Sequence, residues 1–244
     1  NLTRAYERLQ LSNQNLAVSN RELEEANKKL KELDQLKSDF ISIVSHELRT
    51  PLTSIKAFAE LIIMKPGMAL ARQQKLLGVI NSETDRLARL INDILDLTKI
   101  EAGKLSWHIT ELSVDEVIRN SIASMQSLAD NKSILVSIQI EPRLPALVGD
   151  RDRLVQVLTN VLSNSIKFTP QGGKIEVTAR FVQTPKPQIV VAVSDTGVGI
   201  PEEDLELIFE KFQRSGDVLT NNTEGTGLGL TISRQIVEYH GGRI

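Results

Sequence analysis

One histidine stands in a sequence context that could support chemistry. His46 lies in the run SHELRTPL of residues 45–52, inside a segment with helical periodicity. A neutral imidazole nitrogen can act as a nucleophile, and histidine changes its charge near neutral pH. Thr50 lies one turn further along the same helix face, whereas Glu47 must reach around the helix to meet the ring. Taken alone, this pattern also fits an ordinary exposed histidine.

A stripe of three polar residues interrupts a second, otherwise apolar helical segment. Asn160, Asn164 and Lys167 are spaced i, i+4 and i+7, so they share one face of the helix expected over residues 150–167. Side-chain carbonyl oxygens are suitable ligands for Mg²⁺, and a nearby lysine can bind phosphate. The stripe predicts a site for a metal and a phosphate group, and a solvated helix face is the alternative.

Two glycine clusters follow in the last third of the chain. The first, DTGVGI at residues 195–200, follows an apolar strand, so Asp195 can accept a hydrogen bond from an amino group while the glycines allow close approach. A plain turn would favour the same residue types. The second, GTGLGL at residues 225–230, opens a helix, where backbone N–H groups can bind phosphate. Its spacing differs from the P-loop and dinucleotide-binding fingerprints, so alone it is weak evidence.

Long helices are expected to position the histidine. Leucine recurs every seven residues at the start of the chain, at Leu2, Leu9, Leu16, Leu23 and Leu30. This heptad repeat predicts a parallel coiled coil, with a single solvated helix as the alternative. Apolar periodicity then predicts helices over residues 36–64 and 76–97, separated by Pro66-Gly67. Each helix is apolar over more than one stripe, so two such hairpins are expected to form a four-helix bundle.

From about Leu112 the pattern changes to a mixture of helices and strands. The expected helices cover residues 113–130, 150–167, 201–212 and 228–240, and the expected strands cover residues 134–140, 174–182 and 188–194. This mixture predicts an α/β domain that carries the polar stripe and both glycine clusters.

The composition restricts the classes to which the chain can belong. Its 244 residues correspond to one or two domains, and a formal net charge of −2 argues against a nucleic-acid-binding face. The absence of cysteine excludes disulfides, thiolate metal sites and cysteine nucleophiles. No apolar run approaches the roughly 18 residues that a membrane-spanning helix needs.

Together and in this order, the motifs resemble those of the sensor histidine kinases of two-component systems. Residues 45–52 resemble the H-box of the phosphotransfer domain, and residues 160–167 resemble the N-box. Residues 195–200 and 225–230 resemble two glycine boxes, and the run FEKF at residues 209–212 matches the F-box. Five motifs in order make the resemblance specific.

The resemblance covers residues 36–244 and implies a multidomain α and α+β protein. It implies a coiled-coil signalling helix over residues 1–35. A dimerisation and phosphotransfer hairpin over residues 36–104 would then form a dimeric four-helix bundle. The remaining segment, residues 112–244, is expected to be a catalytic ATP-binding domain, an α/β sandwich of the gyrase, Hsp90 and MutL (GHKL) ATPase type.

The resemblance also implies roles for individual residues. His46 is expected to attack the γ-phosphoryl group of ATP through Nε2, Glu47 to assist as general base, and Thr50 to orient water in dephosphorylation of a response regulator. The expected nucleotide site comprises Asn160 and Asn164 for Mg²⁺, Lys167 and Arg214 for phosphates, Phe168 and Asp195 for adenine, and Gly197, Gly199, Gly225, Gly227 and Gly229 for close backbone approach.

The expected partners are a second copy of the chain and a response regulator, whose aspartate receives the phosphoryl group. Phosphatase activity toward that regulator is expected, but no binding of nucleic acid. The expected location is the cytoplasm, and any membrane anchor would precede Asn1, which we expect to lie within a longer protein. Further strands are expected after Gly241-Gly242. The alternatives are an ATPase clamp, as in gyrase or MutL, and a catalytically silent dimeric scaffold.

Overall fold

The computed structural model describes residues 2–211 and 226–244. It leaves undescribed the side chains of residues 2–18, 22, 32, 33, 36 and 37. The chain forms two compact units, residues 1–84 and 85–244. Within the described ranges, no helix is both long enough and apolar enough to span a membrane.

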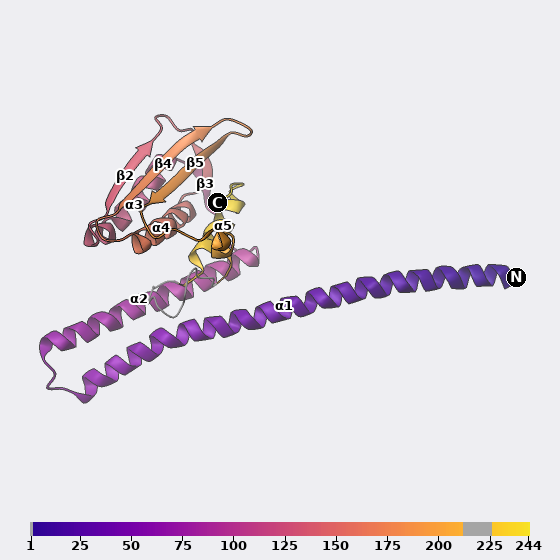
Figure 1. The fold of residues 1–244 in the computed structure, drawn as a ribbon, viewed down its shortest axis with the longest axis horizontal. Helices are drawn as coiled ribbons and strands as arrows, with labels where there is room; N and C mark the ends of the chain where they lie inside the picture. Colours follow the sequence, from indigo (N-terminus) through magenta and orange to yellow (C-terminus); the bar gives the residue numbers. More distant parts are fainter. Residues whose placement is uncertain (1, 212–225) are drawn as a thin grey trace. The chain divides into compact units, whose positions relative to one another are not determined.

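The described part of the first unit consists of helices joined by a turn (Figure 1). Helix α1 runs from Leu2 to Met64 and continues through Pro51, whose side chain is buried. Helix α2 begins at Leu70 after a short turn and runs to Glu101, which lies in the second unit. The heptad segment and the first helix of the predicted hairpin are therefore one continuous helix, and the break between the two helices lies where the sequence predicts it.

Several large apolar side chains of α1 are open to solvent in the single chain. Leu23 and Leu30, on the heptad seam, are 62% and 64% exposed, and Ile41 and Leu52 are also more than half exposed. A leucine seam is buried only against a second helix, so this exposure fits the predicted coiled coil. Pairing of two chains stays a prediction.

The second unit contains two small sheets. Strand β1, Ile109–Leu112, pairs antiparallel with β3, Leu147–Asp150. In the other sheet, β4 (Lys174–Val182) lies in the centre, parallel to β2 (Leu135–Ile140) and antiparallel to β5 (Gln188–Asp195). This sheet ends at Asp195, so its last strand leads directly into the first glycine cluster.

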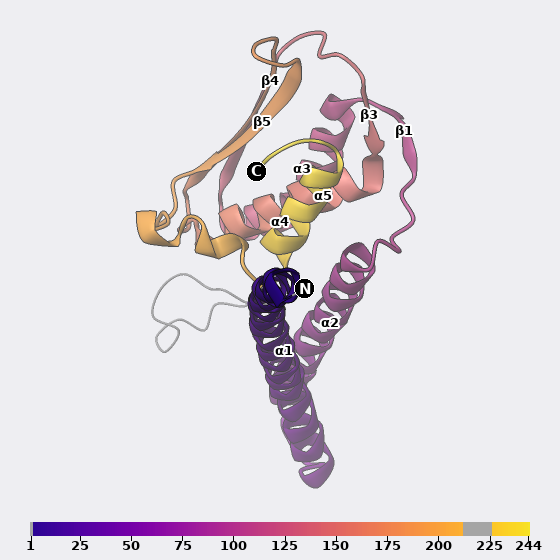
Figure 2. The same cartoon turned by 90° about the vertical axis from the view of Figure 1, so that its right-hand side faces the viewer.

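Three helices lie on one face of the three-stranded sheet: α3 (Val114–Asn131), α4 (Arg151–Phe168) and α5 (Gly229–Tyr239) (Figures 1 and 2). Alternate residues of β4, such as Ile175 and Val177, are buried against α3 and α4. The core therefore lies between helices and sheet, and the predicted fold class, a helical region followed by an α/β domain, is confirmed.

Asp150 fixes the start of α4, the helix that carries the polar stripe. Its carboxylate accepts hydrogen bonds from the backbone N–H groups of Arg153 (3.2 Å) and His108 (2.9 Å). Burial tends to raise the pKa of Asp150, but these bonds and the charge of Arg153 outweigh it and lower the pKa below its ordinary value. The stabilisation by this cap is therefore present at neutral pH and is lost as the pH falls through the lowered pKa.

Two parts of the prediction differ from the structure. The segment predicted as a helix over residues 201–212 contains only two short 3₁₀ turns, Glu202–Asp204 and Leu207–Phe209, in its described part. Strands β1 and β3 were not predicted, because each has only four residues and β3 leads directly into the N-cap of α4. Strand β1 begins at Ile109, three residues before Leu112.

Candidate active site

His46 lies on α1 with its side chain 77% exposed. Its main-chain carbonyl accepts a hydrogen bond from the Thr50 hydroxyl, at 3.2 Å, which places Thr50 one turn along the same face of the helix. An exposed imidazole is accessible to a second protein domain or to a nucleotide. The first unit therefore presents a potential nucleophile, with a hydroxyl group nearby.

Glu47 lies beside one particular nitrogen of the histidine ring. Its Oε1 is 3.9 Å from Nδ1 of His46, and its own side chain is only 19% exposed. A carboxylate on this side favours the tautomer with a proton on Nδ1, which leaves the lone pair on Nε2 available for attack. The sequence indicated only that Glu47 must reach around the helix, and the structure shows that it does so on the Nδ1 side.

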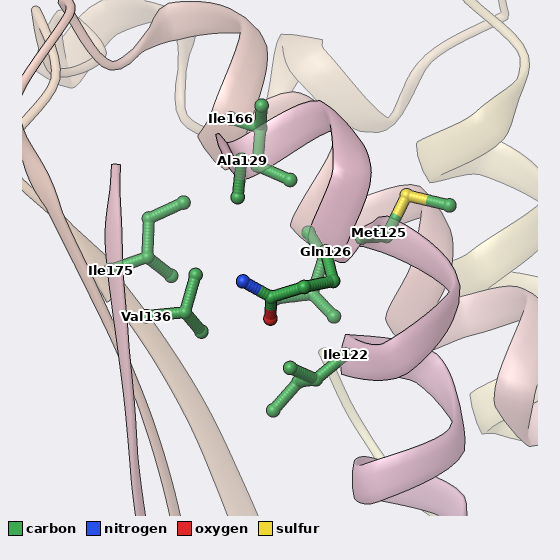
Figure 3. Close-up of a pocket in the computed structure, with 8 residues that line it drawn as sticks. Ile122, Met125, Gln126, Ala129, Val136, Ile166 and Ile175 are labelled. Atoms are coloured by element: carbon green, nitrogen blue, oxygen red, sulfur yellow. The ribbon is translucent and has the colours of Figure 1, made fainter. Parts of the chain in front are cut away.

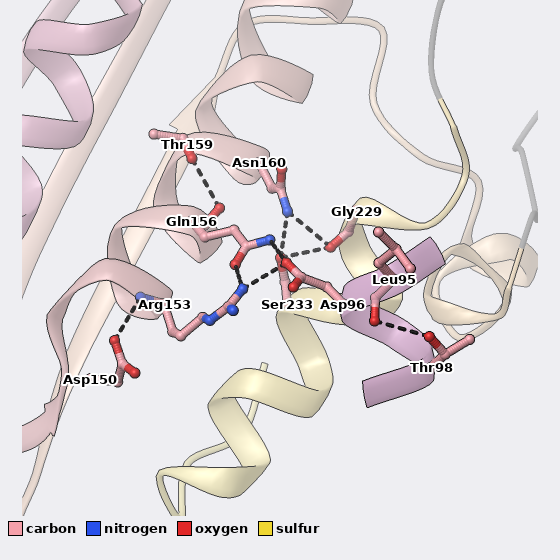
Figure 4. Close-up of polar contacts among 10 residues, drawn as sticks. All are labelled: Leu95, Asp96, Thr98, Asp150, Arg153, Gln156, Thr159, Asn160, Gly229 and Ser233. Atoms are coloured by element: carbon pink, nitrogen blue, oxygen red, sulfur yellow. Dashed lines mark hydrogen bonds and ion pairs between the residues drawn. The ribbon is translucent and has the colours of Figure 1, made fainter. Parts of the chain in front are cut away.

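The predicted nucleotide-binding residues belong to the second unit, and α4 carries four of them. Asn160 is half-buried, and its Nδ2 donates to the carbonyl of Gly229 (3.2 Å) and the hydroxyl of Ser233 (3.4 Å) (Figure 4). Asn160 is thereby tied to the second glycine cluster. Asn164 is also half-buried. Its side-chain amide makes no hydrogen bond within the part of the chain that the structure describes. The side-chain oxygens of both residues fit the oxygen ligands that Mg²⁺ prefers.

The C-terminal end of α4 contacts the first glycine cluster. The Gly197 N–H donates to Oδ1 of Asp195 at 2.9 Å, which fixes the carboxylate. A Cβ atom added to Gly197 would lie 2.7 Å from that oxygen and 2.9 Å from the carbonyl oxygen of Phe168. Only glycine allows this approach, which brings Asp195 to the end of the helix that carries Phe168. Phe168 is 43% exposed, and the Lys167 ammonium lies 4.7 Å from the centre of its ring.

The second glycine cluster reaches α4 nearer its middle. A Cβ added to Gly229 would lie 3.4 Å from the amide carbon of Asn160, and Gly227 has a left-handed backbone with φ of 68°. Asn160 and Phe168 are eight residues apart, roughly 12 Å along the helix, so the two clusters meet α4 at separate points. The structure thus places Asp195 and Gly197 at the end of α4 and Gly229 beside Asn160, whereas Arg214 and Gly225 lie outside the described residues.

Carboxylates of α2 contact this region, and sequence reasoning missed them. The Thr226 hydroxyl donates to Oδ2 of Asp93 at 2.8 Å. Asp96 accepts from Nη1 of Arg153 (2.6 Å) and Nε2 of Gln156 (3.0 Å), both on α4 (Figure 4). Acidic residues on an amphipathic helix are a weak signal, because nothing in their spacing identifies the partner.

The environment of Asp93 favours its neutral form. Burial raises the pKa of this carboxyl above its ordinary value; the hydrogen bond from Thr226 opposes the shift, and the nearby charge of Asp96 adds to it. A carboxyl with a raised pKa in the folded state is stabilised when protonated. The stability of the unit is therefore expected to fall as the pH rises through the interval between its unfolded and folded pKa values, and to stay lower above it.

We expect Asp93→Asn to stabilise the second unit slightly at pH 7.5, by less than about 1 kcal/mol, because asparagine can accept the Thr226 hydrogen bond without a buried charge. The gain should shrink as the pH falls toward the ordinary carboxyl pKa of 3.8, because protonation then removes the buried charge of Asp93 itself. The matched control is Asp96→Asn, which weakens the ion pair with Arg153 and should lower the melting temperature at pH 7.5. Thermal melts of the three proteins at both pH values measure this, and a lower melting temperature for Asp93→Asn at pH 7.5 contradicts it.

One small pocket lies between the helices and the three-stranded sheet (Figure 3). Its lining comes from α3, α4, β2 and β4 and consists of Ile122, Met125, Gln126, Ala129, Val136, Leu162, Ile166 and Ile175. Its volume of about 10 Å³ leaves room for about one water molecule, whereas ligand pockets reach several hundred Å³. The pocket is a packing gap in the core and not a nucleotide site.

Two protein families match two separate parts of the chain. Residues 36–103 match the family described as His Kinase A (phospho-acceptor) domain, and residues 149–244 match the family described as Histidine kinase-, DNA gyrase B-, and HSP90-like ATPase. The first match contains His46 and the second contains α4 and both glycine clusters. The chain belongs to the histidine kinase family. The resemblance drawn from the motifs is thereby confirmed.

Relatives of this histidine kinase chain include a sensory protein and another histidine kinase. The chain is 41% identical over 220 residues to Drug sensory protein A of Synechocystis sp., which aligns with 87% of the chain. It is 35% identical over 211 residues to the circadian input-output histidine kinase CikA of Synechococcus elongatus, which aligns with 85% of it. The chain spans only 33% and 28% of the lengths of these two relatives.

Two solved structures share the fold. The complex of histidine kinase ThkA with the response regulator protein TrrA matches with a TM-score of 0.64 and 28% identity, covering 87% of this chain and 57% of that one. Full-length ShkA in complex with AMPPNP matches with a TM-score of 0.59 and 27% identity, covering 83% of this chain and 41% of that one.

Proposed function

We propose that this chain is the kinase part of a two-component sensor and that it transfers the γ-phosphoryl group of ATP to Nε2 of His46. The observation that carries the proposal is the position of Glu47, whose carboxylate faces Nδ1 and leaves Nε2 free of that contact. A bond forms between Nε2 and the γ-phosphorus while the bond from phosphorus to the β–γ bridging oxygen breaks and ADP leaves. Glu47 stabilises or accepts the proton on Nδ1 as the ring becomes cationic.

The second unit supplies the nucleotide site in this proposal. Asp195, whose carboxylate accepts from the Gly197 N–H, would accept a hydrogen bond from the amino group of adenine, and Phe168 offers an exposed ring for stacking. Lys167 and the N–H groups of the second glycine cluster bind phosphates. Asn160 and Asn164 would hold Mg²⁺, which neutralises charge on the transferred group.

The partners in this proposal are a second copy of the chain and a response regulator. Exposed apolar side chains along α1, such as Leu30 and Leu52, favour a dimeric helix bundle. A regulator aspartate would take the phosphoryl group from His46, and Thr50 would orient water for the reverse dephosphorylation. The solved complex of ThkA with the response regulator TrrA supports this type of partner.

The test is incubation of the chain with γ-labelled ATP and Mg²⁺, with product ADP measured in parallel. We expect a protein-bound label that is stable in base and labile in acid, as a phosphorylated imidazole is. Turnover of ATP without a label would instead indicate an ATPase clamp. Neither label nor turnover would indicate a silent scaffold. Chelation of Mg²⁺ is expected to abolish the label, because the phosphates then keep their full charge.

A further inference from the structure

The carbonyl groups at the C-terminal end of α4 need hydrogen-bond donors from outside the helix. The last carbonyls of a helix have no partner within the helix. The Thr169 N–H satisfies the carbonyl of Ser165, at 3.0 Å. The next carbonyl, that of Ile166, would need a donor at residue 170, but Pro170 has no N–H. The helix that carries the nucleotide site therefore requires a donor from elsewhere in the fold.

Lys132 supplies that donor from the turn between α3 and β2. Its Nζ lies 2.9 Å from the carbonyl oxygen of Ile166, 2.7 Å from that of Lys167 and 3.2 Å from that of Thr169. An ammonium group has three N–H donors, so three carbonyls match its full capacity. A positive charge at this position also interacts favourably with the C-terminal end of the helix dipole.

Backbone hydrogen bonds fasten the same turn to the loop after α4. The Lys132 carbonyl accepts from the Gly172 N–H at 3.0 Å, and the Leu135 N–H donates to the carbonyl of Gly173 at 3.0 Å. A further hydrogen bond links this segment to the first glycine cluster, because the Lys174 N–H donates to the Thr196 hydroxyl at 3.0 Å. Lys132 is thus the side chain that ties this connected backbone to the end of α4.

We propose that Lys132 is a positioning residue of the nucleotide site, holding the end of α4 against the first glycine cluster so that Phe168 and Asp195 bind adenine together. The inference rests on the proposed function. In the sequence, Phe168 stands between Lys167 and Thr169, whose carbonyls accept from Lys132. The Phe168 carbonyl is also a group with which a Cβ on Gly197 would clash. Without the ammonium, those carbonyls lose their donor, and the end of the helix is expected to move away from Gly197.

The test is calorimetric titration of the full chain with ADP and, separately, with GDP. We expect Lys132→Met to raise the Kd for ADP about tenfold, the size of effect for loss of part of a charged hydrogen-bond set, with the binding stoichiometry unchanged. The Kd for GDP should rise less than that for ADP, because guanine carries a carbonyl where adenine has the 6-amino group from which Asp195 would accept a hydrogen bond. Lys186→Met removes an exposed lysine of the same unit and is the matched control, with no change expected.

Lys132→Arg covers the case in which the methionine variant does not fold. It keeps the charge, but its planar fork cannot converge on three carbonyls, so an intermediate rise of about threefold is expected. A reduced binding stoichiometry with an unchanged Kd would mean that Lys132 only stabilises the fold. The same conclusion would follow if the affinities for ADP and GDP fell equally. An unchanged titration would mean that Lys132 has no role in the site. Failure of the unaltered chain to bind ADP would overturn the proposed function itself, so the two failures are distinguishable.

Discussion

Replacing His46 by glutamine is expected to abolish labelling of the chain by γ-labelled ATP, with a loss of at least about 10³-fold. Glutamine keeps a polar side chain of good helix propensity at an exposed position, so the fold should be unaffected. Its amide nitrogen is not nucleophilic, so no phosphoryl group can be transferred to it. The measurement is the rate of label incorporation under saturating ATP and Mg²⁺.

Two control measurements show whether the label is lost because the nucleophile is missing. ADP should bind the His46→Gln variant as it binds the unaltered chain, because the residues proposed for the nucleotide belong to the second unit. In Glu47→Gln, the rate of label incorporation should be lower than in the unaltered chain by a factor of about 10² or more, because this variant keeps the nucleophile but loses the carboxylate beside Nδ1. Full labelling of His46→Gln would show that another residue accepts the phosphoryl group.

Replacing Gly197 by alanine is expected to weaken ADP binding by about 10- to 100-fold, the equivalent of about 1.4 to 2.8 kcal/mol, which lies within the usual cost of overpacking. The new Cβ would lie 2.7 Å from Oδ1 of Asp195 and 2.9 Å from the carbonyl oxygen of Phe168. The second neighbour is main chain at the end of a helix, so it cannot rotate away. The clash must separate the proposed adenine-binding residues, and titration with ADP measures the cost.

Gly78→Ala is the matched control for this substitution. An added Cβ there meets no atom within 4 Å, and the residue lies inside α2, where alanine is favoured over glycine by up to about 1 kcal/mol. Its ADP affinity should be unchanged. If Gly197→Ala binds ADP with unaltered affinity, the close approach of α4 and the first glycine cluster is not needed for the site.

The fold was predictable where a single periodicity extends over a long segment. Apolar residues at helical spacing indicate α1, α2 and α4, and the apolar run before Asp195 indicates β5. Strands β1 and β3 pair through only four residues each, and an alternation of four residues is too short to recognise in the sequence. The predicted helix over residues 201–212 was wrong in its described part because Pro201 and acidic residues, which suit a helix start, here cap only short 3₁₀ turns.

The site was predictable as a set of residue types but not as a set of contacts. The spacing of Asn160, Asn164 and Lys167 places them on one helix face, and the glycines indicate close backbone approach. No sequence pattern reveals that Lys132 donates to carbonyls more than 30 residues away, or that Asp93 accepts from Thr226 across 133 residues. Such contacts depend on tertiary packing, which brings distant segments together without leaving a periodic signal.

The most direct test of the account is to locate the phosphoryl group after reaction with ATP and Mg²⁺. Digestion at alkaline pH preserves a phosphorylated imidazole, and mass spectrometry of the fragments then identifies the modified residue. We predict one modified fragment, containing His46, with the phosphoryl group on Nε2 and complete loss of the modification in acid. Modification of a serine, threonine or aspartate, or no modified fragment despite ADP formation, would contradict the account.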